Sequence, residues 1–188
     1  SGAVAPSAPD ITSGSPAEDL QQTQGTPDAL FYAGRQYVVV TPFDCELVRD
    51  GWAAQPINTL SAAAFVAVGL WLWRSERRMA AVLTGAVGLG SVWFHAAPGE
   101  AATWAHDLTF YALGLASALE VRRLLTARRP PLIAAVIFLA GVVVWFLSRT
   151  GGALCNPDSL IQGHAVWHLA AAAAVGILFR MEEPMPDL

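Results

Sequence analysis

Residues 132–148 have the sequence LIAAVIFLAGVVVWFLS, in which no side chain carries a charge. A helix needs about 20 predominantly apolar residues, within a range of about 17–25, to cross the hydrocarbon core of a bilayer. A single segment in lipid has to be helical, because other backbone conformations leave its N–H and C=O groups unpaired. This stretch therefore predicts a transmembrane helix.

Four further apolar segments of similar length flank residues 132–148 in the sequence. Small residues recur along them, which permits close packing of helices within a membrane, and tryptophans fall near their ends. Together the segments predict an all-α integral membrane protein with a five-helix transmembrane bundle. The predicted helices are Ile57–Trp73, Met79–Ala96, Ala105–Val121, Leu132–Ser148 and Leu160–Phe179.

The composition of the 188-residue chain favours the same class of protein. Hydrophobic residues make up 54% of the chain and charged residues 14%, whereas about a quarter of the residues in soluble domains are charged. The mean hydropathy is +0.44. A formal net charge of -4 gives no support for nucleic-acid binding, which would need a basic patch.

Polarity divides the chain into three parts. Residues 1–42 are rich in Ser, Pro, Gly and Gln, and such a stretch cannot bury enough apolar surface to offset its ordering entropy. We expect a largely extended or disordered N-terminal arm, with a short extended segment over Ala29–Val40. Residues 43–180 form the predicted transmembrane domain, and residues 181–188 form a cytoplasmic tail.

Arginines concentrate in alternate connections between the predicted helices. They lie in the first and third connections and directly after the last helix: Arg74, Arg77, Arg78, Arg122, Arg123, Arg128, Arg129 and Arg180. Because Arg-rich connections remain in the cytoplasm, we expect the N-terminus outside and the C-terminus inside. The predicted location is the inner (cytoplasmic) membrane of a bacterium, as a multi-pass protein.

Both cysteines fall on the outer side of this topology. Cys45 precedes the first helix, and Cys155 lies in the fourth connection. Disulfides form on the oxidising side of a membrane, which favours a bridge over the alternative of two unpaired buried thiols.

Polar residues inside membrane helices are costly and mark functional sites. Ser91 and His95 lie four residues apart, as do His164 and His168, and this spacing places each pair on one helix face. The predicted topology brings both pairs to the outer face of the bundle. Three neutral imidazoles with a fourth position left open form a catalytic zinc site, so we predict that His95, His164 and His168 bind Zn²⁺.

Two further residues could assist chemistry at this site. Asp107, near the predicted start of the third helix, can accept and return a proton as a general base and acid. Ser91 can hydrogen-bond a water molecule or a developing oxyanion. We interpret His106 as an interface residue, because Asp107 is expected to take the inward face. Either histidine motif alone would match many helices by chance, so the prediction rests on their convergence.

These residues resemble the alkaline ceramidase family, within the CREST group of membrane hydrolases that also contains the progestin and adipoQ receptors. The resemblance covers roughly residues 43–180. Its motifs are Cys45-Glu46, Asn58-Thr59-x-Ser61, Ser91-x-x-x-His95, Asp107, Cys155 and Gly163-His164-Ala165-x-Trp167-His168.

The resemblance implies a membrane zinc amidase that cleaves the N-acyl bond of a ceramide-like lipid, with the bilayer and its lipid substrate as partners. It implies the same three histidine ligands, assisting roles for Asp107 and Ser91, and a Cys45–Cys155 disulfide. The family has seven membrane helices, so five indicate a reduced bundle.

The family also binds calcium near its Cys-Glu motif. In this chain, Val48 and Gln55 stand where oxygen ligands are expected. A calcium ion takes six or more oxygen ligands, so calcium binding is doubtful.

A second hypothesis is a non-catalytic accessory subunit of a larger membrane complex that retains a structural zinc site. The five-helix count and the polar arm favour it, because the arm or an open groove could contact other membrane subunits. A receptor of the adipoQ type is the weaker alternative, because that group is also built on seven helices.

Overall fold

The computed structural model describes residues 29–32, 35–38, 44–49 and 51–181. Most of the predicted N-terminal arm, and residues 182–188 of the predicted tail, lie outside these residues. The described part contains five helices and one short hairpin. The helices are α2 (Pro56–Arg74), α3 (Arg78–Ala96), α4 (Glu100–Thr126), α5 (Leu132–Ser148) and α6 (Gly163–Arg180).

The helical class and the number of helices are confirmed, and the largest difference in bounds concerns α4. This helix begins at Glu100 rather than at Ala105 and ends at Thr126 rather than at Val121. Pro98 and Gly99 interrupt the chain just before it, and Glu100 in its first turn suits the positive end of the helix dipole. Asp107 therefore lies inside α4, about two turns from its start.

The start of α6 also differs from the prediction. The helix begins at Gly163 rather than at Leu160, because side chains hold the preceding residues in turns. The Gln162 amide donates to the carbonyl oxygen of Ser159 at 2.7 Å, and the Ser159 hydroxyl oxygen accepts from the Ile161 N–H at 3.0 Å.

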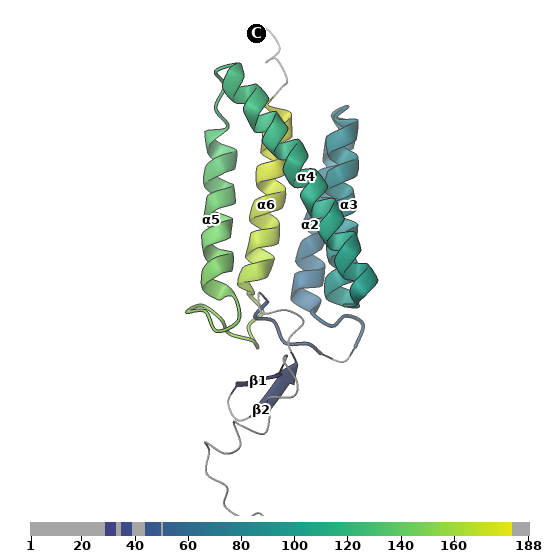
Figure 1. Ribbon diagram of the computed structural model, residues 1–188, viewed down its shortest axis with the longest axis vertical. Helices are drawn as coiled ribbons and strands as arrows, with labels where there is room; N and C mark the ends of the chain where they lie inside the picture. The colour runs from purple at the N-terminus through teal and green to yellow at the C-terminus, as the bar shows by residue number, and fades with distance from the viewer. Residues whose placement is uncertain (1–28, 33–34, 39–43, 50, 182–188) are drawn as a thin grey trace, which may run out of the picture.

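Before the bundle, strands β1 (Ala29–Tyr32) and β2 (Arg35–Val38) pair antiparallel, with Ala29 opposite Val38 and Tyr32 opposite Arg35. This hairpin occupies the segment for which an extended conformation was predicted. Figure 1 shows it beyond the bundle end at which α2 and α6 begin.

The bundle is organised around α6, which contacts each of the other four helices. Figure 1 shows α5 on one side of α6 and α2 and α3 on the other, while α4 runs diagonally across the front of the bundle. Helix α3 packs between α2 and α4, and α5 packs mainly against α6. The backbones of α4 and α5 do not approach each other closely, but Leu124 of α4 and Ala134 of α5 belong to one buried apolar cluster with side chains of α6.

Glycines allow the central helices to approach closely. A Cβ atom added at Gly88 of α3 would lie 2.7 Å from the backbone nitrogen of Val66 in α2. A Cβ atom at Gly90 would lie 2.9 Å from the carbonyl oxygen of Ala105 in α4. Small residues at such contacts are typical of helices that pack within membranes.

Apolar side chains cover much of the outside of the bundle. The exposed ones on α5 alone include Leu132, Ile133, Val136, Phe138, Leu139, Val143, Phe146 and Leu147. Exposed apolar surface on this scale marks contact with a membrane or another protein.

Two helices, α2 and α3, are long and apolar enough to cross a membrane. Helix α5 is also apolar but has 17 residues, and α4 and α6 are not among the candidate spans. The structure thus supports a membrane protein through two candidate spans. The five-span topology and its orientation belong to the proposal below.

Candidate metal centre

Three histidines from two helices meet at one end of the bundle. His95 lies in the last turn of α3, and His164 and His168 lie near the start of α6. One nitrogen of each ring lies within 4.8 Å of the others. His95 and His168 are almost fully buried, and the His164 side chain is 15% exposed. The predicted ligands are therefore brought together into a cluster that could hold a metal ion.

The backbone explains why these residues converge. His164 and His168 are separated by one helical turn and share a face of α6, with ring centroids 4.5 Å apart. Helix α3 ends where α6 begins, so the His95 ring reaches both of the others, at 5.0 and 5.2 Å between centroids.

Each imidazole Nδ1 atom faces an oxygen atom of a different residue. His95 Nδ1 lies 2.7 Å from the side-chain oxygen of Gln55, and His168 Nδ1 lies 2.9 Å from the Ser61 hydroxyl. His164 Nδ1 lies 2.7 Å from Oδ1 of Asp44. Metal-binding histidines nearly always have such a partner on the nitrogen that does not bind the metal.

These partners determine which nitrogen carries the proton. A carboxylate can only accept, so a hydrogen on Nδ1 of His164 would suit its 2.7 Å contact with Oδ1 of Asp44, although the two atoms do not have the geometry of a hydrogen bond. The Gln55 amide nitrogen donates to the carbonyl oxygen of Glu46 at 3.0 Å, which turns the Gln55 oxygen toward His95 as an acceptor. With Nδ1 protonated, the Nε2 lone pairs are left for a ligand.

The remaining nitrogens fit a metal ion. Nε2 of His95 and Nε2 of His164 are buried and have no hydrogen-bond partner in the described part of the chain. A buried polar atom without a partner costs about 1–3 kcal/mol, and a shared metal ion would satisfy both atoms. Imidazole donors suit zinc and also copper, iron and nickel, so the geometry supports a metal site without naming the metal.

Ser91 lies beside this cluster. It is fully buried, and its hydroxyl oxygen is 3.3 Å from Nε2 of His168. One turn of α3 separates it from His95, as the sequence spacing predicts.

Asp107 is placed differently from the expectation. Its side chain is 47% exposed, and its carboxylate lies 2.8 Å from Nδ1 of His106, its one polar contact within the described part of the chain. His106 takes the more buried position of the two and stacks on Phe94 of α3, with ring centroids 5.1 Å apart. Adjacent residues of a helix point in directions about 100° apart, so the stacked ring of His106 leaves Asp107 toward the surface.

Sequence reasoning missed the carboxylate that does contact the cluster. Asp44 is 1% exposed, and besides Oδ1 near His164 its Oδ2 lies 3.9 Å from Nδ1 of His95. The position of Asp44 next to Cys45 is the signal that could have found it, because a bridge to the loop before α6 brings this segment to His164.

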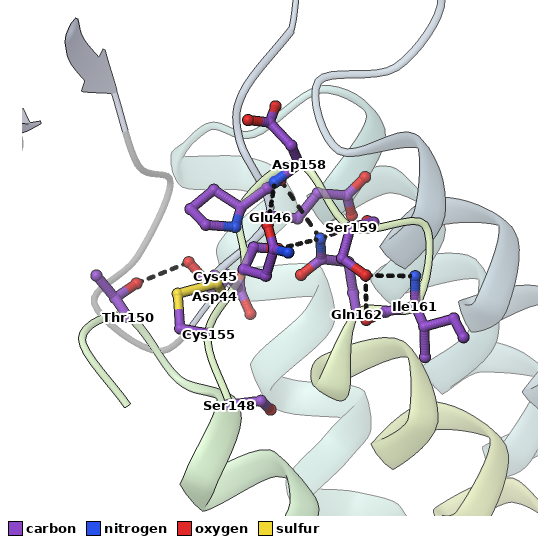
Figure 2. The surroundings of a disulfide bond; sticks show 12 residues. Asp44, Cys45, Glu46, Ser148, Thr150, Cys155, Asp158, Ser159, Ile161 and Gln162 are labelled. Atoms are coloured by element: carbon purple, nitrogen blue, oxygen red, sulfur yellow. Dashed lines mark hydrogen bonds between the residues drawn. A yellow bond between two sulfur atoms is a disulfide. The ribbon is translucent and has the colours of Figure 1, made fainter. Parts of the chain in front are cut away.

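The Cys45–Cys155 disulfide is confirmed, with the two Cα atoms 5.5 Å apart. Figure 2 shows it joining the segment before α2 to the loop between α5 and α6. The next residue, Glu46, accepts hydrogen bonds from the backbone N–H groups of Ile57 and Asn58, both at 2.8 Å. Glu46 thereby caps α2, and its burial raises the pKa of this carboxyl above the ordinary value.

No known family model matches the chain, and no curated protein or solved structure is detectably similar to it. Fold and site therefore define the class: an all-helical protein with two candidate membrane spans and a buried three-histidine cluster that could bind a metal.

Proposed function

We propose that the chain is a zinc-dependent membrane hydrolase that cleaves the amide bond of a ceramide-like N-acyl lipid. The observation that carries the proposal is the donor set. One ring nitrogen of each of His95, His164 and His168 lies within 4.8 Å of the others, while each Nδ1 atom lies close to an oxygen atom of another residue. Three histidine ligands with a position left open for substrate are typical of catalytic zinc. The motifs that resemble alkaline ceramidases supply the reaction class.

Zinc at such a site supplies a water molecule of lowered pKa and polarises a carbonyl group. The protein positions the groups around it. Ser91, buried beside His168, can donate a hydrogen bond to the carbonyl oxygen on which charge develops. Asp107 is proposed to transfer the proton to the leaving amine, as the resemblance implies. Since its carboxylate lies against His106, this role requires the side chain to leave that partner.

The membrane setting is part of the proposal. We infer five spans with the N-terminus outside, in the cytoplasmic membrane of a bacterium. The exposed apolar side chains of α2 to α5 support it. The different residues at the two ends of the bundle support it as well. One end carries the disulfide and the histidines, and the other carries Arg77, Arg128 and Arg129 between helices. The cluster then lies near the outer leaflet, where a lipid headgroup could reach it.

An accessory subunit with a structural metal site is the second candidate. The observation that favours it is the set of exposed apolar side chains on α4 and α5, such as Leu115 and Val136, on two helices whose backbones do not approach each other closely. A helix of another subunit could pack against these side chains. Co-purification of a second membrane protein in fixed stoichiometry, together with a metal-loaded but inactive chain, would favour this function.

The deciding experiment measures zinc per chain in protein purified in detergent without chelator. We expect about one zinc per chain, its loss in the His164→Ala/His168→Ala variant, and its retention in His106→Ala, a matched histidine outside the cluster. The loaded protein should release fatty acid from N-acylsphingosine, and Asp107→Asn should keep the metal but lose most of the rate. A wild-type protein without metal, or a His168→Ala variant that hydrolyses normally, would overturn the proposal.

A further inference from the structure

Residues 44–46 connect the disulfide to two of the three histidines. Asp44 contacts His164, Cys45 carries the bridge, and the Glu46 carbonyl oxygen accepts from Gln55, which in turn accepts from His95. We propose that this tripeptide, the strap, is a positioning element of the metal centre and that the disulfide holds it in place. The inference rests on the proposed metal site and adds Asp44 to it as a positioning residue.

The contact of the strap with α6 is made by Asp44. This carboxylate is buried, and its two oxygens lie 2.7 Å from Nδ1 of His164 and 3.9 Å from Nδ1 of His95. A buried carboxylate beside Nδ1 fixes the ring orientation of a metal-binding histidine and makes its other nitrogen a more basic metal ligand. Asp44 lies between the two rings, so it acts on ligands from both α3 and α6.

The contact of the strap with α3 is indirect. Gln55 is fully buried; its amide nitrogen donates to the Glu46 carbonyl oxygen at 3.0 Å, and its oxygen lies 2.7 Å from Nδ1 of His95. The backbone N–H of Gln55 also donates to the carbonyl oxygen of His95 at 2.9 Å. The position of Glu46 therefore sets the orientation of Gln55, and Gln55 sets that of His95.

The bridge and one further bond hold the strap on its other side. Cys45 is joined to Cys155, and the Thr150 hydroxyl donates to the carbonyl oxygen of Asp44 at 2.8 Å (Figure 2). Cys155 belongs to a loop folded around Gln162, whose amide nitrogen donates to the carbonyl oxygens of Asn156 and Ser159. The loop therefore gives Cys45 a fixed anchor directly before His164.

Removing the bridge should loosen Asp44 and leave the histidine rings less ordered. Loss of a group that orients a ligand typically lowers metal affinity about 10–100-fold. If Asp44 depends on the bridge for its position, the loss of zinc affinity on removing Asp44 and the loss on removing the bridge cannot be independent. A double-mutant cycle on zinc affinity measures this dependence directly.

The experiment determines zinc affinity by chelator competition in the full-length protein, alongside the melting temperature of the metal-free form. Asp44→Ala should weaken zinc binding about 10–100-fold, and Asp44→Asn should lose less because it keeps one acceptor oxygen. Cys45→Ala/Cys155→Ala should weaken binding to a similar degree. Adding Asp44→Ala to that variant should then weaken zinc binding by less than about threefold more. Such a small further loss is expected when the two sites are coupled, because their effects on affinity do not add.

Thr84→Ala is the control for a merely structural role. Thr84 is as buried as Asp44, but it lies outside the strap, and its hydroxyl donates to the carbonyl oxygen of Ala80 in its own helix, α3. We expect a lower melting temperature, because a buried hydrogen bond is lost, with zinc affinity within about threefold of the wild type. Parallel losses of affinity and melting temperature in Asp44→Ala and Thr84→Ala would overturn the inference.

A metal-free readout separates this inference from the proposed function. In protein labelled with ¹⁵N-histidine, the imidazole shifts of His164 should report a proton on Nδ1, and this signature should weaken in Asp44→Ala and in Cys45→Ala/Cys155→Ala. A wild type that binds no metal would overturn the metal centre, yet these shifts would still show whether the strap orients His164. Unchanged shifts in both variants, or fully additive losses of affinity, would overturn the strap.

Discussion

Nδ1 of His168 lies 2.9 Å from the hydroxyl oxygen of Ser61, one helix away. The same hydroxyl donates its hydrogen to the carbonyl oxygen of Asn58 at 2.9 Å. A hydroxyl has one hydrogen to donate, so Ser61 must accept from His168. The Nε2 lone pair of His168 is therefore directed into the cluster, and the sequence pair Asn58–Ser61 acquires a role in it.

Ser61→Ala should weaken metal binding about 10-fold, because Nδ1–H of His168 then loses the hydroxyl acceptor and the ring is less restrained. Chelator competition would measure the affinity. Ser148→Ala is the control, since Ser148 is buried but donates only to backbone oxygens of its own helix. Equal affinities in the Ser61→Ala variant and the wild type would show that Ser61 does not orient His168.

Two glycines of α3 should respond in opposite ways to substitution by alanine. A Cβ atom at Gly88 would lie 2.7 Å from the backbone nitrogen of Val66, whereas a Cβ atom at Gly85 would meet nothing within 4 Å. Gly88→Ala should lower the free energy of unfolding by about 1–3 kcal/mol through overpacking. Gly85→Ala should raise it by up to about 1 kcal/mol through helix propensity. Denaturation in mixed detergent micelles would compare them, and equal effects would contradict the packing of α3 against α2.

The sequence predicted the parts of the structure that depend on local pattern. Long apolar stretches without charged residues located the five helices. The four-residue spacing of His164 and His168 placed these two histidines on one face of their helix. Alternation of helix direction was enough to bring His95 to the same end and Cys45 near Cys155. These inferences need only that each helix forms and that consecutive helices run in opposite directions.

The orientation of single side chains depended on contacts that no local pattern contains. Asp107 was expected to face inward, but the stacking of His106 on Phe94 fixes the rotation of α4 and leaves Asp107 half exposed. Asp44 contacts His164 in a region where a disulfide spanning 110 residues joins the adjacent Cys45 to the loop before α6. Both outcomes are set by tertiary packing.

The pH dependence of stability should contain a contribution from Glu46. Burial raises the pKa of its carboxyl above the ordinary value of 4.5, although the N–H groups of Ile57 and Asn58 act in the opposite direction. A carboxyl whose pKa is higher in the folded than in the unfolded state binds its proton more tightly when folded. Its stabilising contribution is therefore complete below pH 4.5 and is lost as the pH rises through the folded pKa.

Glu46→Gln should remove this contribution. We expect the free energy of unfolding of the wild type, relative to Glu46→Gln, to decrease as the pH rises from about 4.5. Melting curves of both metal-free proteins at pH values above about 4.5 would measure the difference between their free energies of unfolding. The titration of the histidines is common to both proteins and cancels in this difference. A difference that is constant with pH, or that increases, would show that the backbone hydrogen bonds outweigh burial at this carboxyl.

The proposed orientation can be tested with one cysteine at each end of the bundle. Ala97 lies between α3 and α4, and Ala127 lies directly after α4; both are exposed in the structure. Both native cysteines are held in the disulfide, so they should not react with a maleimide. If Arg-rich connections remain in the cytoplasm, Ala97→Cys should react with a membrane-impermeant maleimide in intact spheroplasts. Ala127→Cys should react only after permeabilisation. The reverse pattern would place the histidine cluster on the cytoplasmic side, where a reducing environment disfavours the disulfide. If the protein were found in the soluble fraction and both cysteines reacted equally, the membrane assignment would be contradicted.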